Sequence, residues 1–457
     1  MFKKLFAPTD MTVGSPWKSI VIFTLPMLIG NIAQQLYSTV DSIVVGKYIG
    51  DNALAAVGSA SPILNLLLVL FIGISAGVNI MVSQYFGAKN RDGLSYTIGN
   101  GITATIISCV ILVAIGLPLI SPMLDMLNTP STIKSDCADY LQISLIGIVG
   151  MAFYNILSGV LRGLGDSFSS LIFLLIATVI NIVLDIYFVA NVGMGVGGVA
   201  LATVIAQGIS AFLCFLKLIR MKQHFDFSAK HLLPVSRYIL TVIKLGLPSG
   251  LTQAIFSSAM IIVQSLTNSF GEQFIAANVV IMRVDGFAMM PNFSFGMALT
   301  TFAGQNVGAG LYDRVTKGAK QGTLMAVCCS TVITVAILVF GKGLMSIFTE
   351  TEALVELSYR LMMILALGYI AVAVTQSLSG IMRGAGDTMT PMWISLITTV
   401  AIRVPIAYGI SFFTRTDALP YGRQECIQIS LLISWLIGAL LTFLFYRMGK
   451  WKKKAIR

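Results

Sequence analysis

The sequence predicts an all-α integral membrane protein with twelve transmembrane helices in two six-helix lobes, related by a pseudo-two-fold axis along the membrane normal. Three observations carry this prediction: the composition, the long apolar runs and an internal repeat. Of the 457 residues, 56% are hydrophobic and only 11% are charged, whereas about 25% charged residues is usual in soluble domains. So little charge cannot cover the surface of a soluble fold. The composition excludes a cytosolic globular enzyme, a disordered chain and a nucleic-acid binder with a basic face.

The apolar runs give the number of helices. A helix needs about 20 apolar residues to cross a bilayer, and several of these runs are longer, so we expect tilted helices or ends that project beyond the bilayer. Unbroken runs of this length are unlike the alternating strands of a membrane β-barrel. The predicted spans are 17–48, 53–85, 94–121, 138–161, 167–190, 195–221, 238–270, 274–306, 319–348, 354–382, 388–413 and 426–447.

Basic residues orient these spans. With the N-terminus inside, most of the 30 Lys and Arg residues fall in inner segments, as the positive-inside rule requires. We therefore expect a multi-pass protein of the cell (inner or plasma) membrane with both termini cytoplasmic. The same bias explains the net charge of +11 without a nucleic-acid partner. The basic tail Lys450–Lys454 is either a topology signal or a contact with anionic lipid. The outer segments hold Lys47, Lys134, Lys342, Arg360, Arg415 and Arg423.

The sequence partly matches itself after a shift of about 221 residues. Ser158–Ser167 reappears as Ser379–Thr388, and Gln84–Ala88 reappears as Gln305–Ala309. Leu25-Pro26 reappears as Leu247-Pro248, one residue later than the shift of 221 would place it. This pattern indicates duplication of a six-helix unit, with an N-terminal lobe at 1–221, a cytoplasmic linker at 222–237 and a C-terminal lobe at 238–457. Because six is even, both copies enter the membrane in the same sense, and transporters with a shared central cavity are built in this way.

The repeated segment contains Gly-x-Gly-Asp, which is also the signature of intramembrane aspartyl proteases. It occurs twice, beside Arg162 and Arg383, at predicted span ends. The glycines suit a tight turn with positive φ, and the aspartates Asp166 and Asp387 suit the cap of the following helix. We interpret the motif as a helix-to-helix turn.

Three acids lie inside predicted spans: Asp41, Asp185 and Asp285. A charge at mid-bilayer costs roughly 2.5–3.5 kcal/mol on insertion scales, so each needs a partner or a function. Asp41 and Asp185 continue helical stripes of polar residues. The polar residues on the faces expected to meet in the first lobe are Gln34, Tyr37, Ser38, Asp41, Asn155, Ser158, Thr178, Asn181, Asp185, Thr203 and Gln207.

Such faces would form a pocket of two carboxylates with amide and hydroxyl oxygens. Two nearby carboxylates repel, which favours protonation of one of them, and the same oxygens can hold a hard cation such as Na⁺. The repeat acts as a control, because Asn181 and Asp185 correspond to Ile402 and Ile406, and Asp41 corresponds to Ile262 or Val263. The fold does not require these polar groups. An ion or proton site is therefore favoured over interhelical hydrogen bonding alone.

The second half offers residues for a substrate cavity. Gln253, Ser257, Met260 and Gln264 share a helical stripe, and the next span contains Arg283, Asp285, Met289 and Met290. Adaptable Met side chains suit a promiscuous cavity, although Met at helical spacing is also common in ordinary packing. Together with Gln34 and Asn155 of the first half, we expect Gln253, Met260, Gln264, Arg283 and Met289 to line the substrate cavity.

Cysteine and histidine indicate neither disulfides nor a resident metal. The six Cys fall mostly in apolar runs without Cys-x-x-Cys spacing, and the two His, His224 and His231, share one loop. We expect no cofactor and no metal beyond a coupling H⁺ or Na⁺.

These features together resemble the multidrug and toxic compound extrusion (MATE) family, over essentially all twelve spans. The resemblance rests on Leu25-Pro26, on Gln84–Ala88 with its copy Gln305–Ala309, and on the two Arg-Gly-x-Gly-Asp loops. Tyr37, Asp41, Asn181, Asp185 and Thr203 resemble the cation site of the DinF-like branch. In that branch, the resemblance implies, protonation of the first-helix Asp is coupled to bending at a hinge proline, here Pro26.

The resemblance also implies export of amphipathic, often cationic, drugs or metabolites in exchange for H⁺ or Na⁺. The NorM-like branch carries acidic ligands in its C-terminal lobe, whereas this chain has Gln253, Ile402, Arg403 and Ile406 there. A second-lobe ion site is therefore not expected.

We predict a cation-coupled antiporter that works by alternating access, with small-molecule substrates and the lipid bilayer as its partners, and we expect a monomer. The alternative function is a flippase for lipid-linked precursors, which would need several cations facing the cavity, whereas the sequence offers at most Arg283 and Arg403. A membrane-embedded enzyme is disfavoured because the sequence has no convincing nucleophile–base or metal constellation. A passive channel is disfavoured because the two lobes differ.

Overall fold

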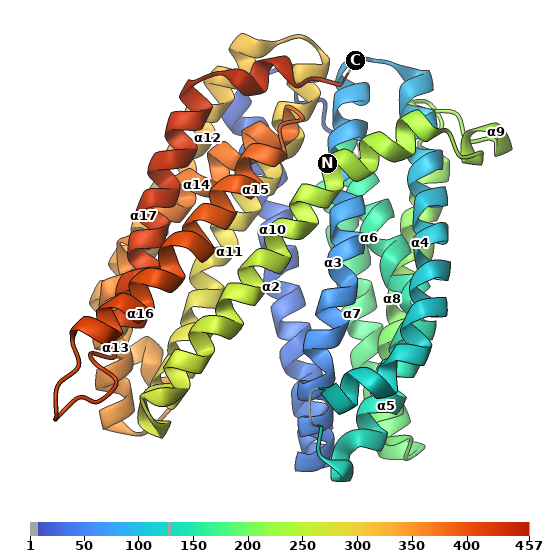
Figure 1. Ribbon diagram of the computed structural model, residues 1–457. Coiled ribbons are helices and arrows are strands. Elements are labelled where there is room, and N and C mark those ends of the chain that lie inside the picture. Colours follow the sequence, from blue (N-terminus) through green and yellow to red (C-terminus); the bar gives the residue numbers. More distant parts are fainter. Residues whose placement is uncertain (1–7, 127–128, 457) are drawn as a thin grey trace. The chain divides into compact units, whose positions relative to one another are not determined.

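The computed structural model describes residues 8–126 and 129–456, without the side chains of Ser38, Ser42, Asp51, Leu54 and Pro62. Within these residues the regular elements are helices (Figure 1). In chain order they are α2 (Pro16–Tyr48), α3 (Asp51–Gly87), α4 (Arg91–Met126), α5 (Ser131–Ile146), α6 (Ile148–Gly163), α7 (Ser167–Ile186), η1 (Tyr187–Asn191), α8 (Gly195–Arg220), α9 (Ala229–Leu232), α10 (Ser236–Ser269), α11 (Glu272–Gly308), α12 (Tyr312–Ser346), α13 (Glu352–Ala366), α14 (Gly368–Gly384), α15 (Met389–Leu396), η2 (Ile397–Ile402), α16 (Arg403–Phe413), α17 (Cys426–Arg447) and η3 (Lys450–Lys453).

The helices confirm the all-α membrane class. Ten of those described are long and apolar enough to cross a bilayer, and two bent helix pairs raise the number to twelve if each pair is one span. Every predicted span coincides with one of these helices or pairs, because each apolar run is long enough to satisfy its backbone hydrogen bonds internally.

Two predicted spans are broken rather than continuous. The helix axis bends by 48° between α5 and α6 and by 46° between α13 and α14. The breaks occur at equivalent positions of the repeat, beside Gly147 and Gly368. A Cβ on Gly147 would lie 2.2 Å from Val204 Cγ2, and one on Gly368 would lie 2.4 Å from Trp435 Cε3. At both breaks a side chain of the neighbouring helix fills the space that a Cβ would need, which hydropathy alone does not reveal.

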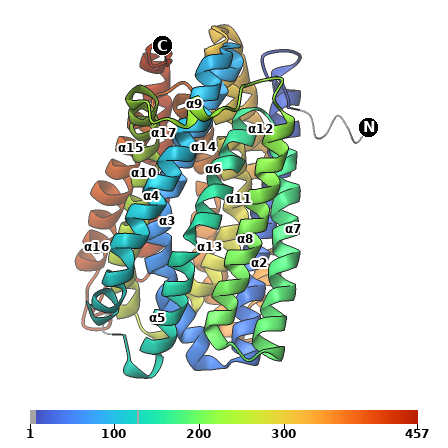
Figure 2. The same ribbon diagram turned by 90° about the vertical axis from the view of Figure 1, so that its right-hand side faces the viewer.

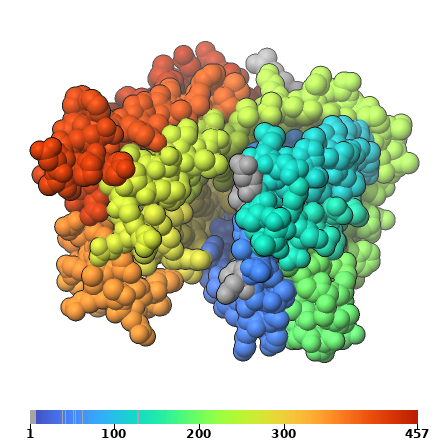
Figure 3. Space-filling view, turned by 60° about the horizontal axis from the view of Figure 1, so that its bottom comes forward, coloured from blue at the N-terminus to red at the C-terminus, as the bar shows by residue number. Residues whose placement is uncertain are grey.

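The chain forms two compact units whose membership differs from the predicted division at 222–237. The first unit contains the described residues up to Asp10 and Leu25–Gly250, and the second contains Met11–Thr24 and the described residues from Leu251 onward. In the space-filling view, the cyan and teal residues of α4 and α5 lie side by side on the surface of the first unit (Figure 3). α2 and α10 each belong partly to both units, and they change unit within three residues of Pro26 and Pro248. The first part of α2 thus groups with the second unit, and the first part of α10 groups with the first unit.

The segment before α2 is bound by the second unit. The Met11 amide donates to Gln305 Oε1 at 2.9 Å, and the Met11 carbonyl accepts from Asn306 at 3.1 Å and from the Arg314 guanidinium at 3.0 Å. Arg314 also donates to the carbonyl of Gly14 at 2.7 Å. The Gln305–Ala309 copy of the repeated motif thus anchors the chain entry into α2.

The linker before α10 is folded against α4 of the first unit. The Arg91 guanidinium donates to both carboxylate oxygens of Asp226, at 2.8 and 2.7 Å. Further along α4, Asn100 bonds the His231 carbonyl at 3.2 Å and accepts from the Val235 amide at 2.7 Å. This linker is an ordered part of the first unit.

Small residues let helices cross closely within the first unit, where α3, α4, α6 and α8 run side by side (Figures 1 and 2). The closest crossing brings α3 against the first part of α10. A Cβ on Gly77 would lie 2.3 Å from the Val242 carbonyl oxygen, and one on Gly246 would lie 2.3 Å from the Gly73 carbonyl oxygen. Such spacing is the small-xxx-small packing of membrane helices.

The Gly-x-Gly-Asp segments form turns, as predicted. Gly165 and Gly386 have φ of +87° and +96°. Asp166 caps α7 by accepting from the Ser169 amide at 2.9 Å, and Asp387 accepts from the Thr390 hydroxyl at 2.8 Å. Both aspartates are thus engaged as helix caps, and Asp166 also pairs with Lys217 at 3.3 Å.

Candidate functional site

Asp41, Asn181 and Asp185 meet inside the first unit. Asp41 comes from α2, while Asn181 and Asp185 are four residues apart on α7 and so share one face. With its amide nitrogen facing the acids, Asn181 donates to Asp41 Oδ1 at 2.9 Å and to Asp185 Oδ2 at 3.0 Å. The two carboxyl groups are also close enough to interact electrostatically with each other. Carboxylates this close repel unless a proton or a cation compensates them.

Two hydroxyl groups complete this cluster. The Tyr37 hydroxyl of α2 donates to the Thr203 hydroxyl of α8 at 3.1 Å, and the Thr203 amide donates to Asn181 Oδ1 at 3.3 Å. Tyr140 of α5 is close enough to interact electrostatically with both carboxyl groups. Tyr37, Asp41, Asn181, Asp185 and Thr203, the predicted set, lie together and are called the acid site below.

The inner part of the acid site is buried, whereas Tyr37, Asp41 and Thr203 are partly exposed. The side chains of Asn181 and Asp185 are fully buried, and Asp185 Oδ1 has no hydrogen-bond partner within the described part of the chain. Apolar residues pack beside the site in a cluster that includes Val44, Val189 and Val199. A buried carboxylate oxygen without a partner is costly. The arrangement can therefore take up a proton or a hard cation, for which carboxylate, amide and hydroxyl oxygens are suitable ligands.

Other polar residues of the predicted pocket lie elsewhere in the first unit. The Gln34 side chain is exposed, Ser38 is outside the described side chains, and Thr178 donates to its own helix at Leu174. The Asn155 amide donates to the Met151 carbonyl at 2.8 Å. These contacts are local to single helices, so the acid site is smaller than the full set of polar faces suggested.

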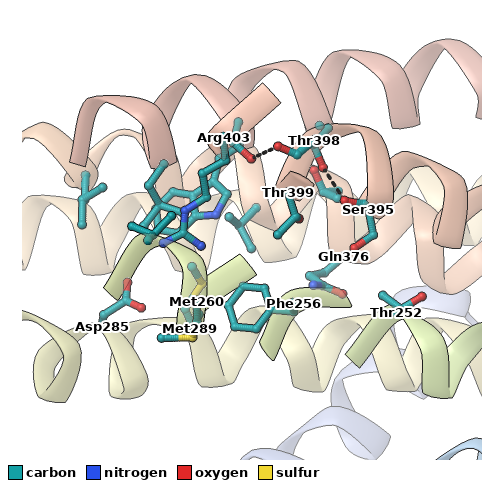
Figure 4. A pocket seen from close by; sticks show the side chains of 18 of the residues that line it. Thr252, Phe256, Met260, Asp285, Met289, Gln376, Ser395, Thr398, Thr399 and Arg403 are labelled. Atoms are coloured by element: carbon teal, nitrogen blue, oxygen red, sulfur yellow. Dashed lines mark hydrogen bonds between the residues drawn. The ribbon is translucent and has the colours of Figure 1, made fainter. Parts of the chain in front are cut away.

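The second unit contains a cavity of about 390 Å³ (Figure 4). Gln253, Met260, Gln264 and Met289, all expected to face substrate, line it. Its other polar or aromatic lining residues include Thr252, Phe256, Asn278, Asp285, Gln376, Ser379, Arg383, Ser395, Thr398, Thr399, Arg403, Gln428 and Trp435. Its volume is within the range of pockets that hold drug-sized ligands.

Arg283, which was expected to face substrate, does not line this cavity. Its side chain is exposed, and two residues along a helix place it on a different face from Asp285. Asp285 does line the cavity and accepts a hydrogen bond from the Tyr369 hydroxyl at 2.9 Å. Arg403 and Arg383 supply the positive charge in place of Arg283. Gln34 and Asn155 belong to the first unit and do not line this cavity either.

Sequence reasoning missed Tyr140 at the acid site and Arg383 in the cavity. A signal for Tyr140 existed, because its counterpart in the second repeat is Leu361, the same polar-to-apolar difference that marked Asp185. For Arg383 the repeat gives no such signal, because its counterpart in the first repeat, Arg162, is also an arginine. Only packing of α14 against its neighbours shows that Arg383 borders a cavity.

The family comparison repeats the duplication seen in the sequence. The MatE family model matches residues 26–187 and again residues 248–409. Both matches begin at the proline of a Leu-Pro pair, Pro26 or Pro248, which confirms the internal repeat.

Full-length relatives are multidrug resistance proteins by name. The chain is 30% identical to "Probable multidrug resistance protein YoeA" of Bacillus subtilis, covering 97% of this chain and 96% of that protein. It is 31% identical to "Probable multidrug resistance protein YpnP" of the same species, covering 97% of each. It is 25% identical to "Probable multidrug resistance protein NorM" of Thermotoga maritima, covering 96% and 94%.

Solved structures share the fold. The chain is similar to the crystal structure of MATE in complex with MaL6, with a TM-score of 0.90 and 23% identity over 97% of this chain and 99% of that one. It is also similar to an outward-facing multidrug resistance MATE family transporter of the MOP superfamily, with a TM-score of 0.89 and 23% identity over 96% and 97%. The family match in both repeats and these end-to-end similarities show that the chain belongs to the MATE family.

Proposed function

We propose that the protein is a cation-coupled antiporter, and not an enzyme, that exports amphipathic, often cationic, drugs or metabolites by alternating access. The observation that carries the proposal is the meeting of the partly exposed Asp41 with the buried Asp185 around Asn181, inside apolar helices long enough to span a membrane. Its full-length relatives with multidrug resistance names support the export of small molecules.

The coupling ion in this proposal is H⁺ or Na⁺ at the acid site, and no other cofactor takes part. Ion uptake between Asp41 and Asp185 neutralises their repulsion and stabilises one state of α2 relative to α7. An ion shifts the equilibrium between two conformational states only to the extent that its affinities for the two states differ. Pro26, where α2 changes unit, is the proposed hinge, as in the DinF-like branch to which we assign the chain.

One ion per cycle is enough for useful export. A single charge that crosses 100 mV releases about 2.3 kcal/mol, which corresponds to roughly a 50-fold concentration gradient. We place the protein in the cell membrane as a monomer with both termini cytoplasmic. The positive charge of the inner segments supports that orientation.

Transport of a lipid-linked precursor is the second candidate function. Arg383 and Arg403, which line the cavity of the second unit, favour it. The volume of about 390 Å³ favours a small amphipathic molecule instead, because it is within the range for drug-sized ligands.

Asp41→Asn tests the proposed function. The variant keeps the shape of the side chain but cannot exchange a proton or neutralise a cation, so ion-driven efflux of a fluorescent organic cation from proteoliposomes should fall at least about tenfold. Imposing a pure pH gradient and then a pure Na⁺ gradient identifies the coupling ion.

Asp125→Asn is the matched control, because Asp125 forms an exposed ion pair with Lys134 at the end of α4. It should transport like the wild type. Wild-type efflux by the Asp41→Asn protein under both gradients would remove the acid site from the mechanism.

A further inference from the structure

The cavity of the second unit contains a buried guanidinium without hydrogen-bond partners for two of its nitrogens. Arg403 is 6% exposed, and neither its Nε nor its Nη1 has a partner within the described residues. Figure 4 shows its side chain turned into the cavity, toward the side where Asp285 and Met289 lie. Leaving the donors of a buried charge unbonded is expensive.

The acid of the cavity, Asp285, attracts this charge but compensates only part of the positive charge of the lining. The ionisable lining residues are Asp285, Arg383 and Arg403, which leaves a formal charge of +1. Asp285 accepts its hydrogen bond from Tyr369, and it forms no ion pair with Arg403 within 4.0 Å among the described residues. The cavity thus has an excess of positive charge and free donors.

The fold does not require an arginine at this position. The counterpart of Arg403 in the first repeat is Ile182, as Ile402 is the counterpart of Asn181. The π-helical segment η2 ends at Ile402, directly before Arg403, and π-helical turns are frequent at functional sites. The second repeat therefore carries a cation, Arg403, on the helix where the first repeat carries an acid, Asp185.

The rest of the cavity lining combines apolar surface with hydroxyl groups. Phe256, Met260, Met289 and Trp435 supply aromatic and flexible apolar surface, and Ser395, Thr398 and Thr399 supply hydroxyl groups. A guanidinium binds carboxylate or phosphate oxygens through paired hydrogen bonds.

We propose that this cavity binds an amphipathic anion, with its acidic group on Arg403 and its apolar body against Phe256, Met260 and Trp435. This inference rests on the proposed transport function in one respect: the bound anion would be a transported substrate. Binding itself needs no ion gradient and no intact acid site.

The test compares two probes that differ only in charge: dansyl-phenylalanine, a carboxylate, and dansyl-phenylalanine amide, which is neutral. Their dissociation constants for the purified protein in neutral detergent are measured from dansyl fluorescence. The acid should bind about tenfold or more tightly than the amide, because a hydrogen bond to a charged group contributes that much. Arg403→Ile, which installs the residue of the first repeat, should abolish the preference and leave amide binding unchanged.

Arg283→Gln is the matched control, since it removes a positive charge from α11 outside the cavity, and it should keep the preference. Equal binding of acid and amide by the wild type, or an intact preference in Arg403→Ile, overturns the proposal. If the Arg403→Ile protein does not bind the amide probe, Arg403→Lys is used instead. Lysine keeps the positive charge but lacks the paired donors of arginine. The dissociation constant of the acid probe should therefore rise severalfold, while that of the amide probe should not change.

The source of the anion is identified by displacement of the dansyl acid. Displacement by decanoate indicates a carboxylate substrate, and displacement by short-chain phosphatidic acid indicates a lipid headgroup. Displacement by either compound supports an anion site. If neither compound displaces the dansyl acid, the result contradicts an anion site. The Asp41→Asn protein should retain the preference, so the anion site and ion coupling can fail independently.

Discussion

At the scale of single residues, Asn181 determines what the acid site can do. Its amide donates to Asp41 and Asp185 at 2.9 and 3.0 Å. A hard cation needs the amide oxygen rather than the nitrogen, so cation entry requires the amide to turn over. The sequence placed Asn181 on the same helix face as Asp185, but the approach of Asp41 from another helix depends on tertiary packing.

Asn181→Ile is expected to fold, because the second repeat has Ile402 at this position. Its apparent affinity should fall about tenfold or more if the coupling ion is Na⁺, because Na⁺ loses the amide oxygen as a ligand. If the coupling ion is H⁺, its apparent affinity should rise, because the carboxylates lose the donor that favours their charged forms. The measurement is efflux from proteoliposomes as a function of ion concentration.

Thr178→Val is a suitable control on the same helix, because the Thr178 hydroxyl bonds only the Leu174 carbonyl among the described contacts. Its ion dependence should equal that of the wild type. An Asn181→Ile protein with the same half-saturating ion concentration as the wild type would show that the amide is not a ligand.

At the scale of elements, helices of this protein are held by close backbone approach as well as by apolar side chains. The α3–α10 crossing leaves no space for a Cβ at Gly77 or Gly246. The same type of contact appears where α14 meets α11, since a Cβ on Gly380 would lie 2.3 Å from the Gly296 carbonyl oxygen. Lipid is as apolar as a leucine side chain, so membrane helices associate by such packing.

Gly77→Ala should destabilise the protein by about 1–3 kcal/mol, because the new methyl group must displace the α10 backbone at Val242. The expected result is a lower apparent Tm in detergent. Gly208→Ala in α8 is the control, since no atom lies within 4 Å of its added Cβ.

Gly208→Ala should leave the Tm unchanged or raise it, because alanine is up to about 1 kcal/mol better than glycine inside a helix. If both alanines changed the Tm equally, the crossing would contribute no more to stability than helix propensity.

At the scale of the whole molecule, the two segments that lead into α2 and α10 are fixed by polar contacts. The linker is held to α4 by Arg91, whose hydrogen bonds and charge hold the pKa of Asp226 below its usual value. A carboxyl group with a lowered pKa contributes stability above its unfolded pKa, and that contribution is lost as the pH falls through the folded pKa. The linker should therefore be docked at neutral pH and released in acid.

Asp226→Asn imitates the acid state at neutral pH. It should increase trypsin cleavage at the exposed linker residues Lys222 and Lys230 severalfold, because the amide cannot form the charged pair with Arg91. Cleavage is followed by gel electrophoresis of the protein in detergent.

Asp313→Asn, an exposed carboxyl in the first turn of α12, is the control and should be cleaved like the wild type. Equal cleavage of all three proteins would mean that the backbone contacts of Asn100 and Thr103 hold the linker without the ion pair.

The sequence by itself determined the membrane class, the spans, the repeat and the Gly-x-Gly-Asp turns, because apolar length, charge bias and turn chemistry are local properties of the chain. It also selected Asp41, Asn181 and Asp185 by their absence from the second repeat. Only the tertiary structure decided that α5–α6 and α13–α14 are broken, that the first parts of α2 and α10 exchange units, and that Arg403 rather than Arg283 enters a cavity. These features depend on the rotation and approach of helices far apart in the chain, and hydropathy and spacing do not encode either quantity.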